Sequence, residues 1–235
     1  MAKLNTNGNV YTIVYATVIV IIVAFLLAFV ASALKPTQDA NVAIDKKQQI
    51  LASLNIRDVE KSATDAKYAE VITEAPVFEA KSTNVIDGLD GFKVDSKEFK
   101  EKRPLYIANI DGETKYIVPM TGAGLWGGIW GYVALNEDCE TVFGTYFSHE
   151  SETAGLGARI TEEWFQTSFN GKKLYADGDT KTIALSVVKK GKEGTLSEAN
   201  YVNGVTGATL TSNGVNEMIQ KSLANYQDIL DTYKK

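Results

Sequence analysis

A long uncharged stretch near the N-terminus is the feature that most limits what this chain can fold into. No charged residue occurs between Lys3 and Lys35, and residues 10–34 are almost wholly apolar. A helix of about 20 apolar residues is long enough to cross the hydrocarbon core of a bilayer. We therefore predict that residues 1–35 form an N-terminal transmembrane anchor.

A cleaved signal peptide is the alternative for this segment, because Ala31–Ala33 has the small-x-small form of a cleavage site. A signal peptide has a basic start and an apolar region of only about 7–15 residues. Lys3 alone is a poor basic start and the apolar run is longer, so the sequence favours an uncleaved anchor. The few lysines on either side leave the orientation of the anchor open.

The rest of the chain is expected to form one soluble part, because it contains no second apolar run of spanning length. The net charge of the chain is −5, which argues against nucleic acid as a partner. The single cysteine, Cys139, has no partner for an intramolecular disulfide, and we expect it to pack near a turn. With one histidine, His149, the sequence also lacks the ligands of a structural zinc site.

Proline and the apolar pattern divide the chain further. Lys35-Pro36 is expected to end the anchor, since proline interrupts helices. A helical pattern resumes over residues 39–55, so residues 36–100 are predicted to hold a helical connector and the start of the soluble domain. Residues 101–235 then form the main domain.

Two pairs of apolar-rich runs predict antiparallel strands in that domain. Residues 103–110 and 113–120 flank Asp111-Gly112, a dipeptide that strongly favours a tight hairpin. Residues 129–135 and 141–148 form the second pair. The predicted fold class is α+β, a mostly antiparallel sheet with flanking helices, preceded by the transmembrane helix.

The last helix is predicted from Asn213 onward, because apolar residues recur there every three or four positions. These positions are Val215, Met218, Ile219, Leu223, Tyr226, Ile229, Leu230 and Tyr233. A segment rich in threonine and glycine, residues 205–212, precedes it. Thr209, Thr211 and Ser212 can each supply an N-cap oxygen, and the free N–H groups of a helix start favour an anion such as phosphate.

Two other glycine-rich loops are candidate binding elements. Residues 122–127 match the letters of the dinucleotide fingerprint G-x-G-x-x-G, but a predicted strand follows where that fingerprint requires a helix. This loop presents Leu125 and Trp126, which either cover a flat ring or pack at a bend.

Residues 148–157 form the other loop. A metal site built on His149, Glu150 and Glu152 has weak support, as does a Ser-His-acid triad, because no nucleophile elbow accompanies the histidine. Glycines at the end of this loop allow a ligand to approach the backbone.

The chain resembles the C subunit of the sodium-translocating NADH:quinone reductase, a family related to the G subunit of the Rnf electron-transport complex. The resemblance rests on the N-terminal anchor followed in order by the segments 122–127, 148–157 and 205–212. The resemblance covers nearly the whole chain. In that family the final threonine of a Ser/Thr-Gly-Ala-Thr motif carries FMN through a phosphoester bond. Here the matching motif is Thr206–Thr209, so the resemblance implies covalent FMN on Thr209 and an FMN-binding domain at residues 101–235.

The resemblance also implies the surroundings and partners of the cofactor. The expected cofactor-binding residues are Thr209, Ala208, Gly207, Thr206, Leu125, Trp126, Glu152, Thr153, Leu156 and Gly157. The implied role is an electron relay within an ion-pumping complex, together with the B, D and E subunits, after maturation by a flavin transferase. The soluble domain is implied to lie on the periplasmic or outer side of the inner membrane.

One position departs from the family's acceptor motif. Asn203 stands where aspartate is usual, six residues before the acceptor; asparagine accepts a similar hydrogen bond but lacks the charge. Two other functions stay open at this point. One is an Rnf-type subunit with covalent FMN, and the other is a cofactor-free anchored interaction domain in which Thr209 only caps a helix.

Overall fold

The computed structural model describes residues 8–234 of the chain. Lys3, the basic residue at the predicted start of the anchor, and Lys235 lie outside the described residues. The chain divides into two compact units, Met1–Asp45 and Lys46–Lys235.

The described part of the first unit is Gly8 followed by most of helix α1 (Asn9–Ser53). Among the described residues it is the one helix long and apolar enough to span a membrane, with a mean hydropathy of 3.1 in its most apolar window. The predicted N-terminal apolar helix is thus confirmed. The break expected in it at Lys35-Pro36 is absent, because α1 continues through Pro36 to Ser53. Proline lacks a backbone N–H, so Pro36 removes one hydrogen bond of the helix, while the residues on both sides of it stay helical. The end of the membrane anchor at residue 35 stays a prediction.

The second unit contains the strands and the remaining helices. Its strands are β1 (Ile72–Glu74), β2 (Val77–Glu79), β3 (Lys102–Pro104), β4 (Tyr106–Ile110), β5 (Glu113–Ala123), β6 (Gly128–Leu135), β7 (Val142–His149), β8 (Ser186–Val188) and β9 (Tyr201–Asn203). Its α-helices after α1 are α2 (Thr64–Val71), α3 (Glu163–Thr167) and α4 (Thr209–Tyr233). Short 3₁₀ helices are η1 (Gly91–Lys93), η2 (Ser96–Glu98), η3 (Gly157–Thr161) and η4 (Glu198–Asn200).

The main sheet is antiparallel, with the strand order β1-β4-β5-β6-β7. The two predicted strand pairs are confirmed as β4–β5 and β6–β7. The β4–β5 turn uses Asp111 and Gly112, both with positive φ (52° and 89°), as a tight hairpin turn requires. The predicted strand 103–110 is interrupted at Leu105, because β3 pairs with β2 in a separate small sheet. Strands β8 and β9 form a parallel pair.

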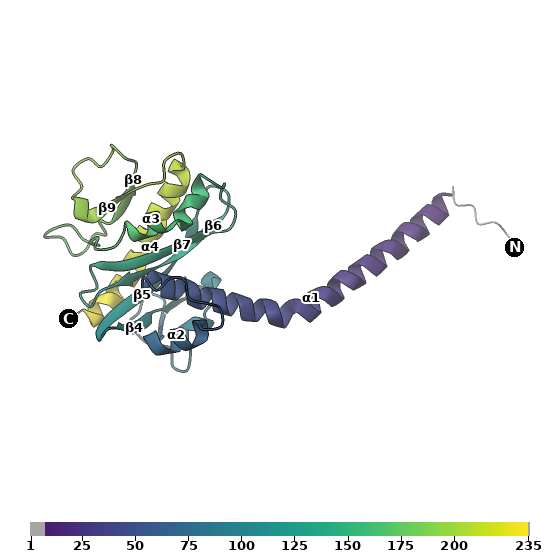
Figure 1. Ribbon diagram of the computed structural model, residues 1–235, viewed down its shortest axis with the longest axis horizontal. Helices are drawn as coiled ribbons and strands as arrows, with labels where there is room; N and C mark the ends of the chain where they lie inside the picture. Colours follow the sequence, from purple (N-terminus) through teal and green to yellow (C-terminus); the bar gives the residue numbers. More distant parts are fainter. Residues whose placement is uncertain (1–7, 235) are drawn as a thin grey trace. The chain divides into compact units, whose positions relative to one another are not determined.

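Alternate side chains of the central strands enter two separate cores. Tyr106 and Tyr132 face one core, which is closed by α2 and by Ile50 from the last turns of α1. Their neighbours Ile107 and Val133 face the other core, which is closed by α4. The sheet therefore lies between α4 on one face and α2 with the end of α1 on the other (Figure 1). This is the predicted α+β architecture.

Helix α4 lies along β5 with its apolar face buried. Every predicted apolar position from Val215 to Leu230 is buried, and Tyr233 is partly buried against the same core. The added Cβ of a side chain at Gly214 would collide with the carbonyl oxygen of Ala123. The start of α4 therefore packs tightly against the end of β5, and this contact brings the β5–β6 loop beside the first turn of the helix.

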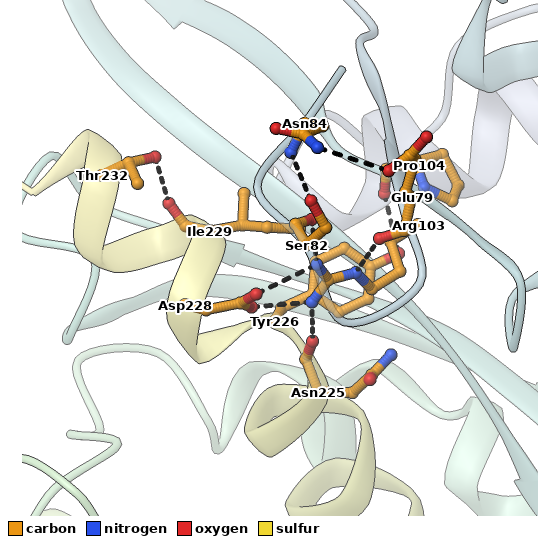
Figure 2. Close-up of polar contacts among 10 residues, drawn as sticks. All are labelled: Glu79, Ser82, Asn84, Arg103, Pro104, Asn225, Tyr226, Asp228, Ile229 and Thr232. Atoms are coloured by element: carbon orange, nitrogen blue, oxygen red, sulfur yellow. Dashed lines mark hydrogen bonds and ion pairs between the residues drawn. The ribbon is translucent and has the colours of Figure 1, made fainter. Parts of the chain in front are cut away.

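A buried arginine ties the second half of α4 to the loop that follows β2 (Figure 2). Arg103 is 1% exposed, and its guanidinium donates to both carboxylate oxygens of Asp228, at 2.7 and 3.0 Å. The remaining N–H groups donate to the backbone carbonyls of Glu79, Ser82 and Asn225. Because every donor of the guanidinium has an acceptor, the charge is compensated inside the fold.

Candidate functional site

The segment before α4 forms a tight turn that fixes where the helix begins. The N–H of Ala208 donates to the carbonyl of Val205 at 3.0 Å, and Gly207 has a φ of +84° at the third position of this turn. The hydroxyl of Ser212 accepts from the N–H of Val205 at 3.0 Å. The first turn of α4 and the preceding loop are thereby fastened to each other.

The helix begins at Thr209, and its N-cap residue is Ala208, which makes no side-chain capping bond. Thr211 and Ser212, two of the three candidate caps, do not cap this helix. The buried Thr211 hydroxyl donates to Glu152, and the buried Ser212 hydroxyl accepts from the N–H of Val205. They lie inside the first turn, where their hydroxyls reach neighbouring segments. The helix start therefore presents uncapped N–H groups and the positive end of the helix dipole.

Thr209 is exposed at this helix start, as are Thr206 and Gly207, whereas Ala208 is buried. The backbone turn thus directs the two threonines of the motif towards solvent. An exposed hydroxyl beside uncapped N–H groups is a suitable place for a phosphate ester, because the N–H groups can donate to the remaining phosphate oxygens.

The β5–β6 loop is closed by a hydrogen bond from the N–H of Gly124 to the carbonyl of Gly127, at 2.8 Å. It exposes two large apolar side chains, Leu125 (47% exposed) and Trp126 (66% exposed). Strand β6 follows directly, so the structure agrees with the exclusion of a dinucleotide fingerprint. The alternative in which Trp126 packs into a core is not the arrangement seen.

The loop after β7 carries Glu152, a residue that is 7% exposed. One carboxylate oxygen accepts from the N–H of Trp126 at 2.8 Å, and the other accepts from the hydroxyl of Thr211 at 2.6 Å. Burial opposes the charged form, but the hydrogen bonds from Thr211, Trp126 and Leu125 outweigh it, so the pKa of Glu152 is lowered. Glu152 is therefore an ionised carboxylate that joins this loop to the β5–β6 loop and to α4.

The rest of the same loop reaches the turn before α4. The N–H groups of Leu156 and Ala158 both donate to the carbonyl of Thr153, at 3.1 Å. Leu156 is exposed and approaches so closely that a Cβ on Gly207 would lie 3.0 Å from its Cδ2. Gly157 is buried next to Glu152. All ten residues expected from the sequence thus lie on three segments that meet at the start of α4.

Two residues contribute to this site in roles that were not expected from the sequence. Thr211 supplies a hydroxyl to Glu152, and His149 accepts from the N–H of Glu152 through Nδ1 at 3.1 Å. Nothing in the local pattern distinguishes these contacts from a helix cap or a surface loop. Within residues 8–234, no group of three or more His, Cys, Asp or Glu side chains is placed to hold a metal ion.

Comparison with known proteins defines the class of this fold and site. Residues 124–224 match the FMN-binding domain family. That segment includes the two exposed loops and the start of α4. The chain thus carries a segment of the FMN-binding domain family behind a helix long and apolar enough to span a membrane.

The relatives identify the family. The chain is 31% identical over 235 aligned residues to the C subunit of the Na(+)-translocating NADH-quinone reductase of Haemophilus ducreyi, an alignment that covers 92% of this chain and 90% of the relative. It is 29% identical to the same subunit of Pseudomonas aeruginosa, with 92% and 91% covered. The solved structure of the C subunit from Parabacteroides distasonis has a TM-score of 0.77 and 40% identity, and covers 84% of this chain and 96% of its own. The chain belongs to the C-subunit family of the Na(+)-translocating NADH-quinone reductase, an oxidoreductase complex.

Proposed function

We propose that this protein carries FMN on Thr209 through a phosphoester bond and relays electrons within its complex. The observation that carries the proposal is the exposed residue Thr209 at the uncapped start of α4, in the Thr-Gly-Ala-Thr motif. The helix N-terminus supplies N–H donors and a positive dipole end, both of which stabilise a phosphate. The FMN-binding family match over residues 124–224 supports the same cofactor.

The residues present fit the group. A phosphodiester on Thr209 would keep one negative charge, which the helix start can stabilise without any basic side chain. The exposed apolar side chains of Leu125, Trp126 and Leu156 offer a surface for the flat isoalloxazine ring. The exposed hydroxyls of Thr153 and Thr206 are available to its polar edge. When bound, FMN supplies the electron transfer, and the protein holds and tunes it.

Attachment requires the Thr209 hydroxyl to lose its proton and form a bond to phosphorus. A direct condensation of free FMN with the hydroxyl would release a water molecule and is unfavourable in aqueous solution. The FMN donor must therefore carry the phosphate in an anhydride, and the other half of the anhydride is the leaving group. The turn at Gly207 exposes the hydroxyl to an enzyme that holds such a donor. We assign this step to a flavin transferase.

The family relationship supports a place for the protein in the inner membrane, with the soluble domain on the periplasmic or outer side. The B, D and E subunits are the proposed neighbours. In this arrangement Thr209 would hold the FMN, which would supply electron transfer between an iron–sulfur centre and the FMN of the B subunit. The protein alone would not oxidise NADH.

The test is to express the full chain together with a flavin transferase and examine the denatured protein on a gel under ultraviolet light. The wild-type band should fluoresce, and its mass should exceed that of the unmodified chain by FMN less one water. Thr209→Ala should abolish both signals because it removes the accepting hydroxyl.

Two variants control for this experiment. Thr209→Ser keeps a hydroxyl at the same place and should retain some attachment. Thr121→Ala removes an exposed hydroxyl from the end of β5 and should label like the wild type. An unmodified wild-type mass after co-expression with an active transferase would refute covalent attachment.

A further inference from the structure

A buried hydrogen-bonded chain connects the first turn of α4 to the loop that carries Trp126. The Thr211 hydroxyl donates to Oε2 of Glu152, and Oε1 of the same carboxylate accepts from the N–H of Trp126. Thr211 is 1% exposed, and it lies two residues after Thr209. The carboxylate therefore spans from the helix that bears the proposed acceptor to the loop that bears the exposed indole.

Two glycines lie directly against this carboxylate. A Cβ on Gly124 would collide with Oε1 of Glu152, and a Cβ on Gly157 would collide with Oε2. These two glycines come from the two different loops. Because glycine has no side chain, both positions leave space that the carboxylate occupies. The position of Glu152 is therefore set by packing as well as by hydrogen bonds.

The charge state of Glu152 suits this role. A carboxylate is an acceptor at both oxygens, and here the Thr211 hydroxyl donates to one oxygen and the N–H of Trp126 donates to the other. Hydrogen bonds to a charged acceptor are roughly twice as strong as neutral ones. A buried carboxylate that loses a donor bears the full cost of desolvation, so the Thr211 hydroxyl cannot be removed without consequence.

We propose that Thr211 and Glu152 are positioning residues that hold the Trp126 loop against the start of α4 and thereby set how the indole lies beside a cofactor on Thr209. The part of this inference that concerns the cofactor rests on the function proposed above. The part that concerns the loop is a property of the chain itself and is present before any flavin is attached.

The test compares Thr211→Val with Thr211→Ser in the full-length protein without flavin. Valine keeps the shape of threonine and removes the hydroxyl, whereas serine keeps the hydroxyl. Hydrogen–deuterium exchange of the segment Gly124–Gly127 reports on the hydrogen bond from Trp126 to Glu152. Exchange should be about tenfold faster in Thr211→Val, the change expected from losing one hydrogen bond to a charged group. Thr211→Ser should exchange at the wild-type rate.

Glu152→Gln is the second variant, in case the first fails to fold. The amide oxygen can still accept from the N–H of Trp126, while the amide NH₂ donates to the Thr211 oxygen. Exchange of the loop should then lie between the wild type and Thr211→Val. Exchange over β4, far from this site, should be unchanged in both variants and serves as the internal reference.

A spectroscopic measurement on protein labelled by a flavin transferase tests the cofactor part. Flavin fluorescence in the native protein should rise in Thr211→Val relative to Thr211→Ser, because an indole held beside a flavin quenches it. Equal exchange in the valine and serine variants would overturn the proposal even if the flavin is attached. Failure of the wild type to take up flavin would instead refute the function proposed for Thr209. The hydrogen–deuterium exchange of the flavin-free protein would then still decide whether Thr211 and Glu152 hold the Trp126 loop.

Discussion

Removing Asp228 tests how strongly the buried guanidinium of Arg103 fixes α4. Arg103 is 1% exposed, and two of its charge-assisted hydrogen bonds end on Asp228, whose side chain is 43% exposed. Asp228→Ala removes both bonds and leaves the three backbone carbonyl acceptors in place (Figure 2). The positive charge then stays buried without its counterion.

The expected cost follows from these contacts. Breaking a fully buried ion pair by deleting one partner costs about 3–5 kcal/mol. Because Asp228 is nearly half exposed, water can enter from its side and recover part of this energy, so we expect a loss of about 2 kcal/mol in the free energy of unfolding. Asp228→Asn keeps one acceptor and should lose about half as much.

Denaturant unfolding of the full-length protein, followed by tryptophan fluorescence, measures this loss. All three tryptophans, Trp126, Trp130 and Trp164, lie in the unit Lys46–Lys235, so the signal reports that unit alone. Asp231→Ala, an exposed aspartate on the same helix, is the matched control and should change stability by less than about 0.5 kcal/mol. Equal effects of the two alanine variants would refute the reasoning.

The same pair predicts a pH dependence. The hydrogen bonds from Arg103 hold the pKa of Asp228 below its ordinary value. A carboxyl with a lowered folded pKa contributes stability above its unfolded pKa of about 3.9 and loses it as the pH falls through the folded value. The difference between wild type and Asp228→Ala should therefore be constant near neutral pH and shrink below about pH 4.

Three further substitutions or probes test other parts of the structure. Gly207→Ala should lower the free energy of unfolding by about 1–2 kcal/mol because of its φ of +84°, and by somewhat more because the added Cβ lies 3.0 Å from Leu156. Gly112→Ala has a φ of +89° and open space around it, so it should show only the loss due to backbone strain. A larger loss for Gly112→Ala than for Gly207→Ala would contradict the close approach of Leu156. Burial raises the pKa of the Cys139 thiol to about 12. Thiol reagents at pH 8 should therefore label Cys139 only when the protein is unfolded by denaturant. Rapid labelling of the native protein would contradict this burial. Trp126→Ala should leave flavin attachment intact but make the flavin more accessible to a soluble quencher; unchanged accessibility would remove Trp126 from the cofactor surface.

Much of the fold follows from signals that are local in the sequence. The apolar stretch ending near Lys35 predicts a spanning helix because its length matches a bilayer, and Asp111-Gly112 predicts a hairpin because both residues adopt positive φ. The apolar spacing after Asn213 predicts the buried face of α4. Each of these three signals can be recognised from residues that are close together in the sequence.

Other parts of the fold depend on contacts that local signals do not contain. The helix break expected at Pro36 is absent, because α1 continues beyond the proline to residues that pack into a core. The break at Leu105 is set by the pairing of β3 with β2, which is a tertiary contact. The burial of the sheet on both faces likewise depends on which helices cover it.

The candidate site shows the same division. The sequence by itself determined the chemical types at the site: a threonine in a Thr-Gly-Ala-Thr motif, and apolar residues and glycines in the loops. Only the tertiary structure decided that Glu152 and Thr211, 59 positions apart, share a buried hydrogen bond, and that Thr211 is therefore not a helix cap. The physical reason is that a hydroxyl near a helix start can serve either role, and the choice depends on which carboxylate the fold brings within reach.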